Sequence, residues 1–337
     1  MGVIRLAIDA MGGDYAPAEI VAGVVEGARD FDLNLILVGD PDALQAELAR
    51  HSIDGLPVEV VPSSGAVRMD EDPVQAVRTR PEASINVACS LVLQGRADGV
   101  LSMGHSGASG IAGLFHFGAL PGVDRPAIVA PLLGLRENMY LVDAGANTEV
   151  RPQHLLQFAL MGAAYVECAT GVSRPRVALL SNGSEANKGN KVTKAAFPLL
   201  AAEPKLNFAG NIEGSTLLTS DINVVVCDGF VGNIFFKSTE GVIEALLTEV
   251  EAMLSSLPPE MATHLQPRLE ALKERNDYAT YGAAALVGLK QPLFIGHGHS
   301  RAKAVRNSIA TAQKMIQQDV LGRISHVLKD VQATAVG

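Results

Sequence analysis

The chain has 337 residues, of which 48% are hydrophobic, so it can bury a large core in one big domain or two. Its formal net charge of −9 argues against nucleic-acid binding, because nucleic-acid-binding proteins present a basic surface. Three cysteines, none in a Cys-x-x-Cys pair, indicate a reducing cytoplasm and no zinc site, and no apolar run reaches the roughly 20 residues of a membrane span.

Strand and helix signals alternate through the first half of the chain. Short runs rich in β-branched residues predict buried strands, and apolar residues at helical spacing predict the helices between them. The expected strands are 5–8, 33–38, 58–61, 99–102, 127–130 and 139–142. The expected helices are 18–29, one ending at His51, 84–94, one after Gly110, and 152–169, while the polar segment 63–80 is assigned no element.

The second half continues this alternation with one interruption. The expected strands are 177–180, 206–209, 222–227 and 293–296, and helices are expected up to Ala201, from Ile234 onward and after Ser300. The interruption is a pair of helices, about 241–256 and 261–275, joined at Pro258-Pro259. Such alternation predicts an α/β fold with a mostly parallel sheet and helices on both faces. We expect one domain over 1–337, with 241–275 as a helical excursion.

The stretch 221–241 organises the candidate site. A buried strand ends at Cys227, Asp228-Gly229 breaks it, and Gly232-Asn233 allows a positive φ or a close backbone approach before a helix. A strand, a glycine turn and a helix N-terminus form an anion pocket, because the first N–H groups of the helix lack partners. Similar turns follow other strands. Since ligands bind past the carboxyl ends of parallel strands, we expect these turns to converge on one anionic or carbonyl-bearing substrate.

The common nucleotide-binding and nucleophile motifs are absent. The sequence contains neither Gly-x-Gly-x-x-Gly nor a phosphate-binding loop ending in Gly-Lys-Ser/Thr. The run from Gly298 to Ala302 nearly matches a nucleophile elbow around Ser300, but its final glycine is missing. Cys227 beside Asp228 is either a nucleophile or a small core residue, and the second role is the commoner one for such a cysteine.

The loop 182–191 combines amide side chains, glycines and lysines. Lys188 lies between Asn187 and Gly189, and Lys191 and Lys194 follow, so the local charge is positive. A lysine in a glycine loop after a strand can hold phosphate or an oxyanion, and it can equally be an ordinary surface lysine. Asn233 is likewise either a helix N-cap or a hydrogen-bond donor into the cleft.

Six runs in order along the chain carry a family resemblance. They are 9–14, 141–147, 188–190, 210–214, 228–233 and 277–288. With these runs the chain resembles the bacterial phosphate acyltransferases that make acyl phosphate from acyl-[acyl carrier protein]. The resemblance implies a Rossmann-like three-layer αβα fold, related to the phosphotransacetylase and isocitrate-type dehydrogenase folds. It also implies a cytoplasmic homodimer, loosely associated with the membrane, that supplies a membrane glycerol-3-phosphate acyltransferase of phospholipid synthesis.

The reaction that the resemblance implies is attack of inorganic phosphate on a fatty thioester, with no metal, no redox cofactor and no covalent intermediate. We expect Lys188 to be the cation for phosphate or the oxyanion, and Asn233 to donate a hydrogen bond to the same centre. The further substrate-binding residues expected are Asp9, Gly12, Gly13, His105, Ser106, Gly107, Asn147, Asn190, Asp228 and Gly232. His105 stands where the family usually has an amide side chain.

Two other enzyme classes stay open, namely a phosphotransacetylase-like enzyme for short acyl-coenzyme A thioesters and an isocitrate-type dehydrogenase. The helix pair 241–275 carries apolar stripes, which are typical of core or dimer contacts. The family's membrane habit suggests that its tip, near Leu257 and Met261, touches lipid. For the acidic acyl carrier protein we expect docking at Arg268, Lys273 and Arg275.

Overall fold

The computed structural model describes residues 2–133 and 138–335, with side chains up to residue 329, so the expected domain 1–337 extends beyond the described residues. Its strands form one sheet in the order β3-β2-β1-β4-β11-β10-β5-β6-β9-β7-β8. Their bounds are β1 Ile4–Asp9, β2 Leu33–Gly39, β3 Val58–Pro62, β4 Gly99–Ser102, β5 Ala127–Pro131, β6 Tyr140–Val142, β7 Arg176–Leu180, β8 Asn207–Ile212, β9 Val224–Val226, β10 Ala284–Val287 and β11 Leu293–Ile295.

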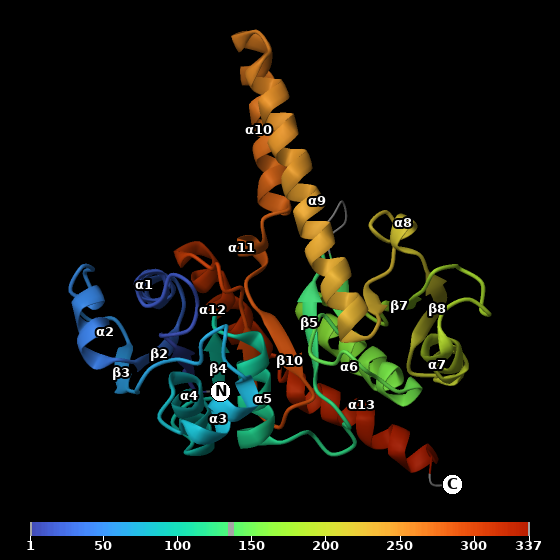
Figure 1. Cartoon of the computed structure of the whole chain (residues 1–337), viewed down its shortest axis with the longest axis horizontal. Coiled ribbons are helices and arrows are strands. Elements are labelled where there is room, and N and C mark those ends of the chain that lie inside the picture. The colour runs from blue at the N-terminus through green and yellow to red at the C-terminus, as the bar shows by residue number, and fades with distance from the viewer. Residues whose placement is uncertain (1, 134–137, 336–337) are drawn as a thin grey trace.

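Helices cover both faces of this sheet, as Figure 1 shows, and the predicted three-layer α/β architecture is confirmed. Their bounds are α1 Ala18–Asp30, α2 Pro41–Leu48, α3 Pro73–Thr79, α4 Ser84–Leu93, α5 Ser106–Phe117, α6 Pro152–Thr170, α7 Lys191–Ala202, α8 Gly214–Leu217, α9 Gly229–Ser255, α10 Pro259–Arg275, α11 Tyr278–Tyr281, α12 Ala302–Gln317 and α13 Val320–Ala335.

Alternation along the strands builds the layers. Leu6 and Ile8 of β1 face one core cluster, which α1, α6, α12 and α13 complete, while Ala7 faces a second cluster under α4 and α5. In the other half of the sheet, Val225 of β9 faces a third cluster that Phe235 and Phe236 of α9 cover. One face therefore has a continuous helical cover, whereas the helices on the other face fall into two separate groups.

The sheet reverses direction at its centre. The pairs β11–β10, β10–β5 and β5–β6 are antiparallel, whereas the other pairings are parallel. The strands β3-β2-β1-β4-β11 therefore run opposite to β6-β9-β7-β8, and the carboxyl ends of the two groups lie at opposite edges. The expectation that the glycine turns all lie on one side of the sheet is wrong, because the antiparallel pair β5–β6 reverses the strand direction.

Four local expectations also need correction. The polar segment 63–80 contains α3. Asp72 caps the N-terminus of this helix, because its carboxylate accepts a hydrogen bond from the Gln75 N–H at 2.7 Å. Strand β10 and helix α13 were not expected at all. The stretch 229–255 is one continuous helix, α9, which starts five residues before the expected Ile234 because Asp228 caps it by accepting from the Val231 N–H at 2.9 Å.

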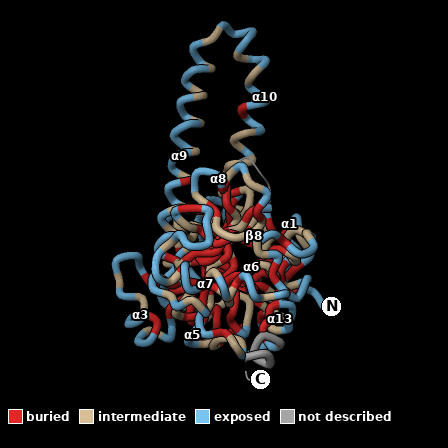
Figure 2. Tube along the Cα trace, turned by 90° about the vertical axis from the view of Figure 1, so that its right-hand side faces the viewer, coloured by how far each residue is buried: buried red, intermediate tan, exposed pale blue. Residues whose placement is uncertain are grey.

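The excursion predicted at 241–275 is present as a protruding helical hairpin made of the outer part of α9 and all of α10 (Figure 1). Figure 2 shows that its residues are mostly exposed, while the buried residues concentrate in the body of the molecule. Leu269 is the buried exception on α10, at 4% exposure. Among the described helices, none combines the length and apolar character needed to cross a membrane.

Candidate active site

A cavity of about 740 Å³ lies where the two groups of covering helices separate. Its floor is the centre of the sheet, with Ile128 and Ala130 from β5, Ala284 from β10 and Ile295 from β11. In Figure 1 β5 and β10 lie between α5 and the base of α9. The central strands have only three to five residues, so each is about 10–17 Å long. Turns at both edges of the sheet are therefore close enough to line this central cavity.

Helix α9 forms one wall of the central cavity. Asn233, Phe236, Lys237, Glu240 and Glu244 all line it, at the spacing of one helical face. Lys237 is exposed and has no ion pair among the described residues. Of the described residues that line the central cavity, it is the one lysine or arginine. It therefore brings one positive charge, one helical turn beyond Asn233, to a lining that also holds the carboxylates of Asp14, Glu240 and Glu244.

The opposite wall comes from turns after β1, β4 and β11. It includes Asp14, Gly104, Ser106, His297 and His299. His299 Nδ1 lies 2.6 Å from Asp14 Oδ2, and His297 Nε2 lies 3.4 Å from Glu240 Oε1. The cavity is thus lined by two histidine–carboxylate pairs, an amide side chain and a lysine.

Asp9 supports the first of these turns from beneath. It is 3% exposed and accepts from the Ser102 hydroxyl at 2.8 Å and from the Met11 N–H at 3.3 Å. Burial raises the pKa of its carboxyl, and these hydrogen bonds oppose that rise. Gly12 leaves no room for a side chain, since an added Cβ would lie 2.6 Å from Asp9 Oδ2 and 2.8 Å from Gly104 Cα. Asp9 and Gly12 therefore position the backbone.

Asp143 plays the same role for the start of α9. Its carboxylate accepts from the backbone N–H groups of Ile128, Gly145, Ala146 and Asn147 and from the Asn147 amide. Asn147 is 7% exposed, and its amide also donates to the Pro126 carbonyl, so it is a buried support and not a surface ligand. Gly232 fits against this turn, because an added Cβ would lie 1.9 Å from the Asp143 carbonyl oxygen.

The Lys188 loop leaves the sheet next to α9, because β7 and β9 pair in parallel with Leu179 opposite Val226. The Gly189 N–H donates to Asn182 Oδ1 at 2.8 Å, with Gly189 at φ 105°, and this turn holds the exposed Lys188. Asn190 caps α7 by accepting from the Val192 and Thr193 N–H groups. Lys188 does not line the central cavity that contains Asn233.

His105 caps α5 through its ring. Its Nδ1 accepts from the Gly107 N–H at 3.0 Å and the Ala108 N–H at 3.3 Å. An acceptor nitrogen carries no proton, so the ring presents Nε2–H as a donor. An asparagine side chain likewise offers one acceptor and one donor. A histidine can therefore cap α5 at the position where the family usually has an amide side chain.

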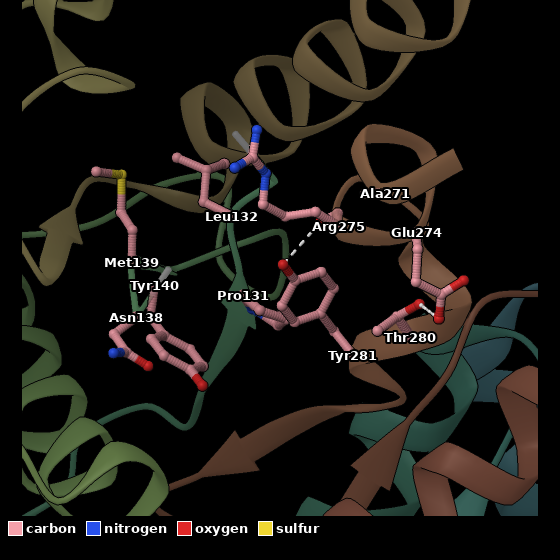
Figure 3. A pocket seen from close by; sticks show the side chains of 10 residues that line it. All are labelled: Pro131, Leu132, Asn138, Met139, Tyr140, Ala271, Glu274, Arg275, Thr280 and Tyr281. Atoms are coloured by element: carbon pink, nitrogen blue, oxygen red, sulfur yellow. Dashed lines mark hydrogen bonds between the residues drawn. The ribbon is translucent and has the colours of Figure 1, made fainter. Parts of the chain in front are cut away.

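The three cations expected to dock a carrier protein have different surroundings. Arg268 is exposed, whereas Lys273 forms an ion pair with Glu251. Arg275 lines a second cavity of about 520 Å³, and Figure 3 shows it beside Leu132 and Tyr281. The Tyr281 hydroxyl donates to the Arg275 carbonyl at 2.7 Å, and Arg275 Nε is buried without a hydrogen bond in the described part.

A groove of about 640 Å³ between α9 and α10, the hairpin groove, is lined by carboxylates from both helices. They are Glu240, Glu244, Glu251, Glu270 and Glu274, with Asp277 just beyond α10. This negative lining opposes the approach of an acidic partner to this face of the hairpin.

The structure brings some of the expected residues together and leaves others apart. Ser106 and Asn233 line the central cavity, and Gly12 and Gly13 belong to the turn that leads into Asp14. Asp9 and Asn147 are buried supports, and Asp228, Asn190 and His105 are helix caps. Gly107 is in the first turn of α5, and Gly232 in that of α9.

Sequence reasoning missed Lys237, His297 and His299 as cavity residues. A helix begun at Asp228 would have placed Lys237 one turn after Asn233, on the same face, so the capping aspartate was the available signal. The two histidines follow β11, whose position beside β4 no sequence pattern indicated.

The alternative nucleophiles do not fit the central cavity. Cys227 is buried, and burial together with the nearby Asp143 and Asp228 charges raises the pKa of its thiol well above the usual value. Ser300 is 3% exposed and is not among the described cavity residues. Within the described residues, no three histidine, cysteine, aspartate or glutamate side chains converge as a metal site requires.

Comparisons with known proteins show the family to which the chain belongs. The profile of a family described as fatty acid synthesis protein matches residues 4–323. A phosphate acyltransferase of Nostoc punctiforme is 43% identical over 328 residues, covering 95% of each chain. A phosphate acyltransferase of Pelotomaculum thermopropionicum is 43% identical over 336 residues, covering 99% of this chain and 98% of its own.

Solved structures show the fold. A phosphotransacetylase from Staphylococcus aureus matches with a TM-score of 0.58 at 20% identity, covering 93% of this chain and 94% of that one. A 4-hydroxythreonine-4-phosphate dehydrogenase from Klebsiella pneumoniae matches with a TM-score of 0.52 at 14% identity, covering 94% and 98%. The expected relation to phosphotransacetylase and dehydrogenase folds is confirmed. The chain therefore belongs to the fatty acid synthesis protein family, in which its similar relatives are phosphate acyltransferases.

Proposed function

We propose that this protein transfers a long-chain fatty acyl group from acyl-[acyl carrier protein] to inorganic phosphate, giving acyl phosphate for phospholipid synthesis. Family membership with near full-length similarity to phosphate acyltransferases carries the proposal. The central cavity supports it, since Asn233 and Lys237 bring a donor and a positive charge to one surface. Those are the groups that an anionic nucleophile and a developing oxyanion need.

The proposed step is a direct displacement. A phosphate oxygen attacks the thioester carbonyl carbon, the C–S bond breaks, and the thiol and acyl phosphate leave. Phosphate is already nucleophilic, so the protein contributes position and charge stabilisation. Asn233 donates to the carbonyl oxygen and Lys237 holds phosphate in the central cavity. Lys188 lies outside the described cavity lining, and its role requires that its flexible side chain reach the same phosphate from the loop after β7, next to α9.

The apolar part of the central cavity suits a fatty chain. Ile128, Pro131, Leu133, Phe236 and Ile295 line it alongside the polar groups. Burial of one methylene contributes about 0.8 kcal/mol, so a long chain gains several kcal/mol here that an acetyl group cannot. This difference favours a long-chain substrate over a short one.

Thiol release in the presence of phosphate tests the function. We expect the protein to release free carrier-protein thiol from long-chain acyl-carrier protein only when phosphate is present, and acyl phosphate to accumulate in equal amount. A mass spectrum of the products identifies the acyl phosphate. Full-speed thiol release without phosphate, or an acylated side chain trapped during turnover, would contradict direct attack by phosphate.

Two controls separate the rival enzymes. A phosphotransacetylase-like enzyme, which the fold neighbours favour, would prefer acetyl-coenzyme A over the long-chain carrier substrate. A dehydrogenase would change nicotinamide absorbance when given hydroxy acids and would need no thioester.

We also propose that the protein works in the cytoplasm, at the membrane surface, where its product enters lipid synthesis. The hairpin tip supports this, since Met261 is 55% exposed and Leu257 is half-buried beside it. Replacing both with asparagine should abolish flotation of the protein with anionic phospholipid vesicles, because the apolar contact is lost. Leu93→Asn, at another exposed apolar site, is the matched control. Equal flotation of the tip variant and the control would reject the tip as the lipid contact.

A further inference from the structure

We propose that His297, positioned by Glu240, donates the proton that the departing sulfur takes up in the acyl transfer. This inference rests on the proposed function and adds a catalytic residue to it. His297 follows β11 and lines both the central cavity and the hairpin groove, at the point where they meet. A leaving thiol moving from one to the other passes this side chain.

Glu240 gives the ring a fixed partner. Its Oε1 is buried and has no hydrogen bond in the described part of the chain, and it lies 3.4 Å from His297 Nε2. A buried carboxylate oxygen without a hydrogen bond is costly, and a protonated imidazole 3.4 Å away would offset part of that cost. Glu240 is a positioning residue in this arrangement, as a carboxylate is for a catalytic histidine elsewhere.

Two aromatic rings hold the imidazole in place. Phe236 stacks on His297 with ring centroids 6.4 Å apart and planes 20° apart, and the Tyr278 ring lies 5.1 Å away. His297 Nε2 is the ring nitrogen nearer Glu240, at 3.4 Å from Oε1, and the other nitrogen, Nδ1, has no hydrogen bond among the described residues. The ring is therefore fixed on one side and has a nitrogen available for proton transfer on the other.

The proton balance of the reaction gives this nitrogen a task. Hydrogen phosphate dianion carries one proton, acyl phosphate dianion carries none on the transferred phosphate, and the alkyl thiol product gains one. In this step His297 starts doubly protonated: as the C–S bond breaks, its Nδ1 proton passes to sulfur and leaves a neutral ring with Nε2–H toward Glu240. The proton of the attacking phosphate then passes to Nδ1. Lys237 and Asn233 retain their protons throughout, and the histidine ends as it began.

His299 provides a matched control. It lines the same cavity and its Nδ1 lies 2.6 Å from Asp14 Oδ2, but its side chain is 76% exposed, against 37% for His297. Its partner Asp14 is itself 41% exposed, so solvent already satisfies this pair. The structure thus offers two histidine–carboxylate pairs, and only the pair with the less exposed carboxylate, Glu240 at 20%, is assigned the proton transfer.

Leaving-group acidity tests the assignment. Two substrates share one acyl group, a decanoyl thioester of pantetheine and the S-phenyl thioester of decanoic acid. An aryl thiolate is a good leaving group and departs without taking up a proton. An alkyl thiolate is a poorer leaving group, so its departure gains more from a proton donor. We expect His297→Ala to lower kcat about a hundredfold on the pantetheine ester and at most severalfold on the phenyl ester. Glu240→Gln should show the same selectivity with a smaller loss, whereas any loss in His299→Ala should be equal on the two esters.

Each outcome decides the matter. Equal losses of His297→Ala on both esters would mean that the ring only shapes the cavity, and an unchanged rate on the pantetheine ester would remove it from the reaction. Both results overturn the assignment while leaving the proposed function intact, because the unaltered protein still releases thiol with phosphate. If the unaltered protein releases no thiol from long-chain acyl-carrier protein in a phosphate-dependent way, the proposed function fails, and the role of His297 fails with it.

Discussion

Replacing Lys188 with alanine is expected to lower kcat for phosphate-dependent thiol release about a thousandfold while leaving the unfolding temperature unchanged. Lys188 is exposed and has no ion pair in the described part of the chain, so its removal costs no native contact of that kind. Its loop is held by the Gly189-to-Asn182 hydrogen bond, which does not involve the lysine side chain. Initial rates with long-chain acyl-carrier protein, together with thermal unfolding curves, measure both effects.

Two further lysines make this result interpretable. Lys191→Ala removes an exposed lysine three residues on and should leave kcat near normal. Lys237→Ala removes the lysine that lines the central cavity and should chiefly weaken phosphate binding, seen as a raised KM for phosphate. Near-normal activity of Lys188→Ala would remove Lys188 from the mechanism. If Lys237→Ala is then inactive, the cation of the site is the one on α9.

The sequence predicts β1 and β2 well because these strands are long and mostly buried. Each is a largely apolar run next to a recognisable helix, so its type and order follow from local pattern. The centre is different. β10 reads Ala-Ala-Leu-Val and has four residues, too few for a pattern to show, and it is antiparallel to both of its neighbours. The net reversal that decides which edges the turns reach comes from the antiparallel pair β5–β6, and β6 has only three residues.

In the candidate site, too, the sequence predicts some residues from local pattern and misses others that depend on tertiary structure. The polar turn residues after β1, β6 and β9 are evident in the sequence, because aspartate and glycine at strand ends have few other roles. Which of them line the central cavity depends on tertiary placement: Asp9 and Asp143 direct their carboxylates into backbone N–H groups or a buried hydroxyl. His297 reaches the same cavity as Asn233 only because β11 lies between β4 and β10.

Replacing Gly232 with alanine should both destabilise the protein and abolish activity. Gly232 is not at positive φ, so glycine is needed there for space: an added Cβ would lie 1.9 Å from the Asp143 carbonyl oxygen and 3.0 Å from Cys227 Sγ. The first of these neighbours is backbone, held by the hydrogen bonds of the Asp143 turn, so α9 must move instead. Overpacking of this kind costs about 1–3 kcal/mol of unfolding free energy.

The movement matters for activity because the next residue is Asn233. A shift of the first turn of α9 carries Asn233 and Lys237 out of register with the opposite wall of the central cavity, and misplacement by about 1 Å can cost a hundredfold in rate. Gly241→Ala is the matched control on the same helix, since nothing lies within 4 Å of its added Cβ and alanine favours the helix by up to about 1 kcal/mol. Urea unfolding should therefore show a lowered midpoint for Gly232→Ala and an equal or raised one for Gly241→Ala. A Gly232→Ala protein as stable and as active as the unaltered one would mean that the start of α9 is not fixed against the Asp143 turn.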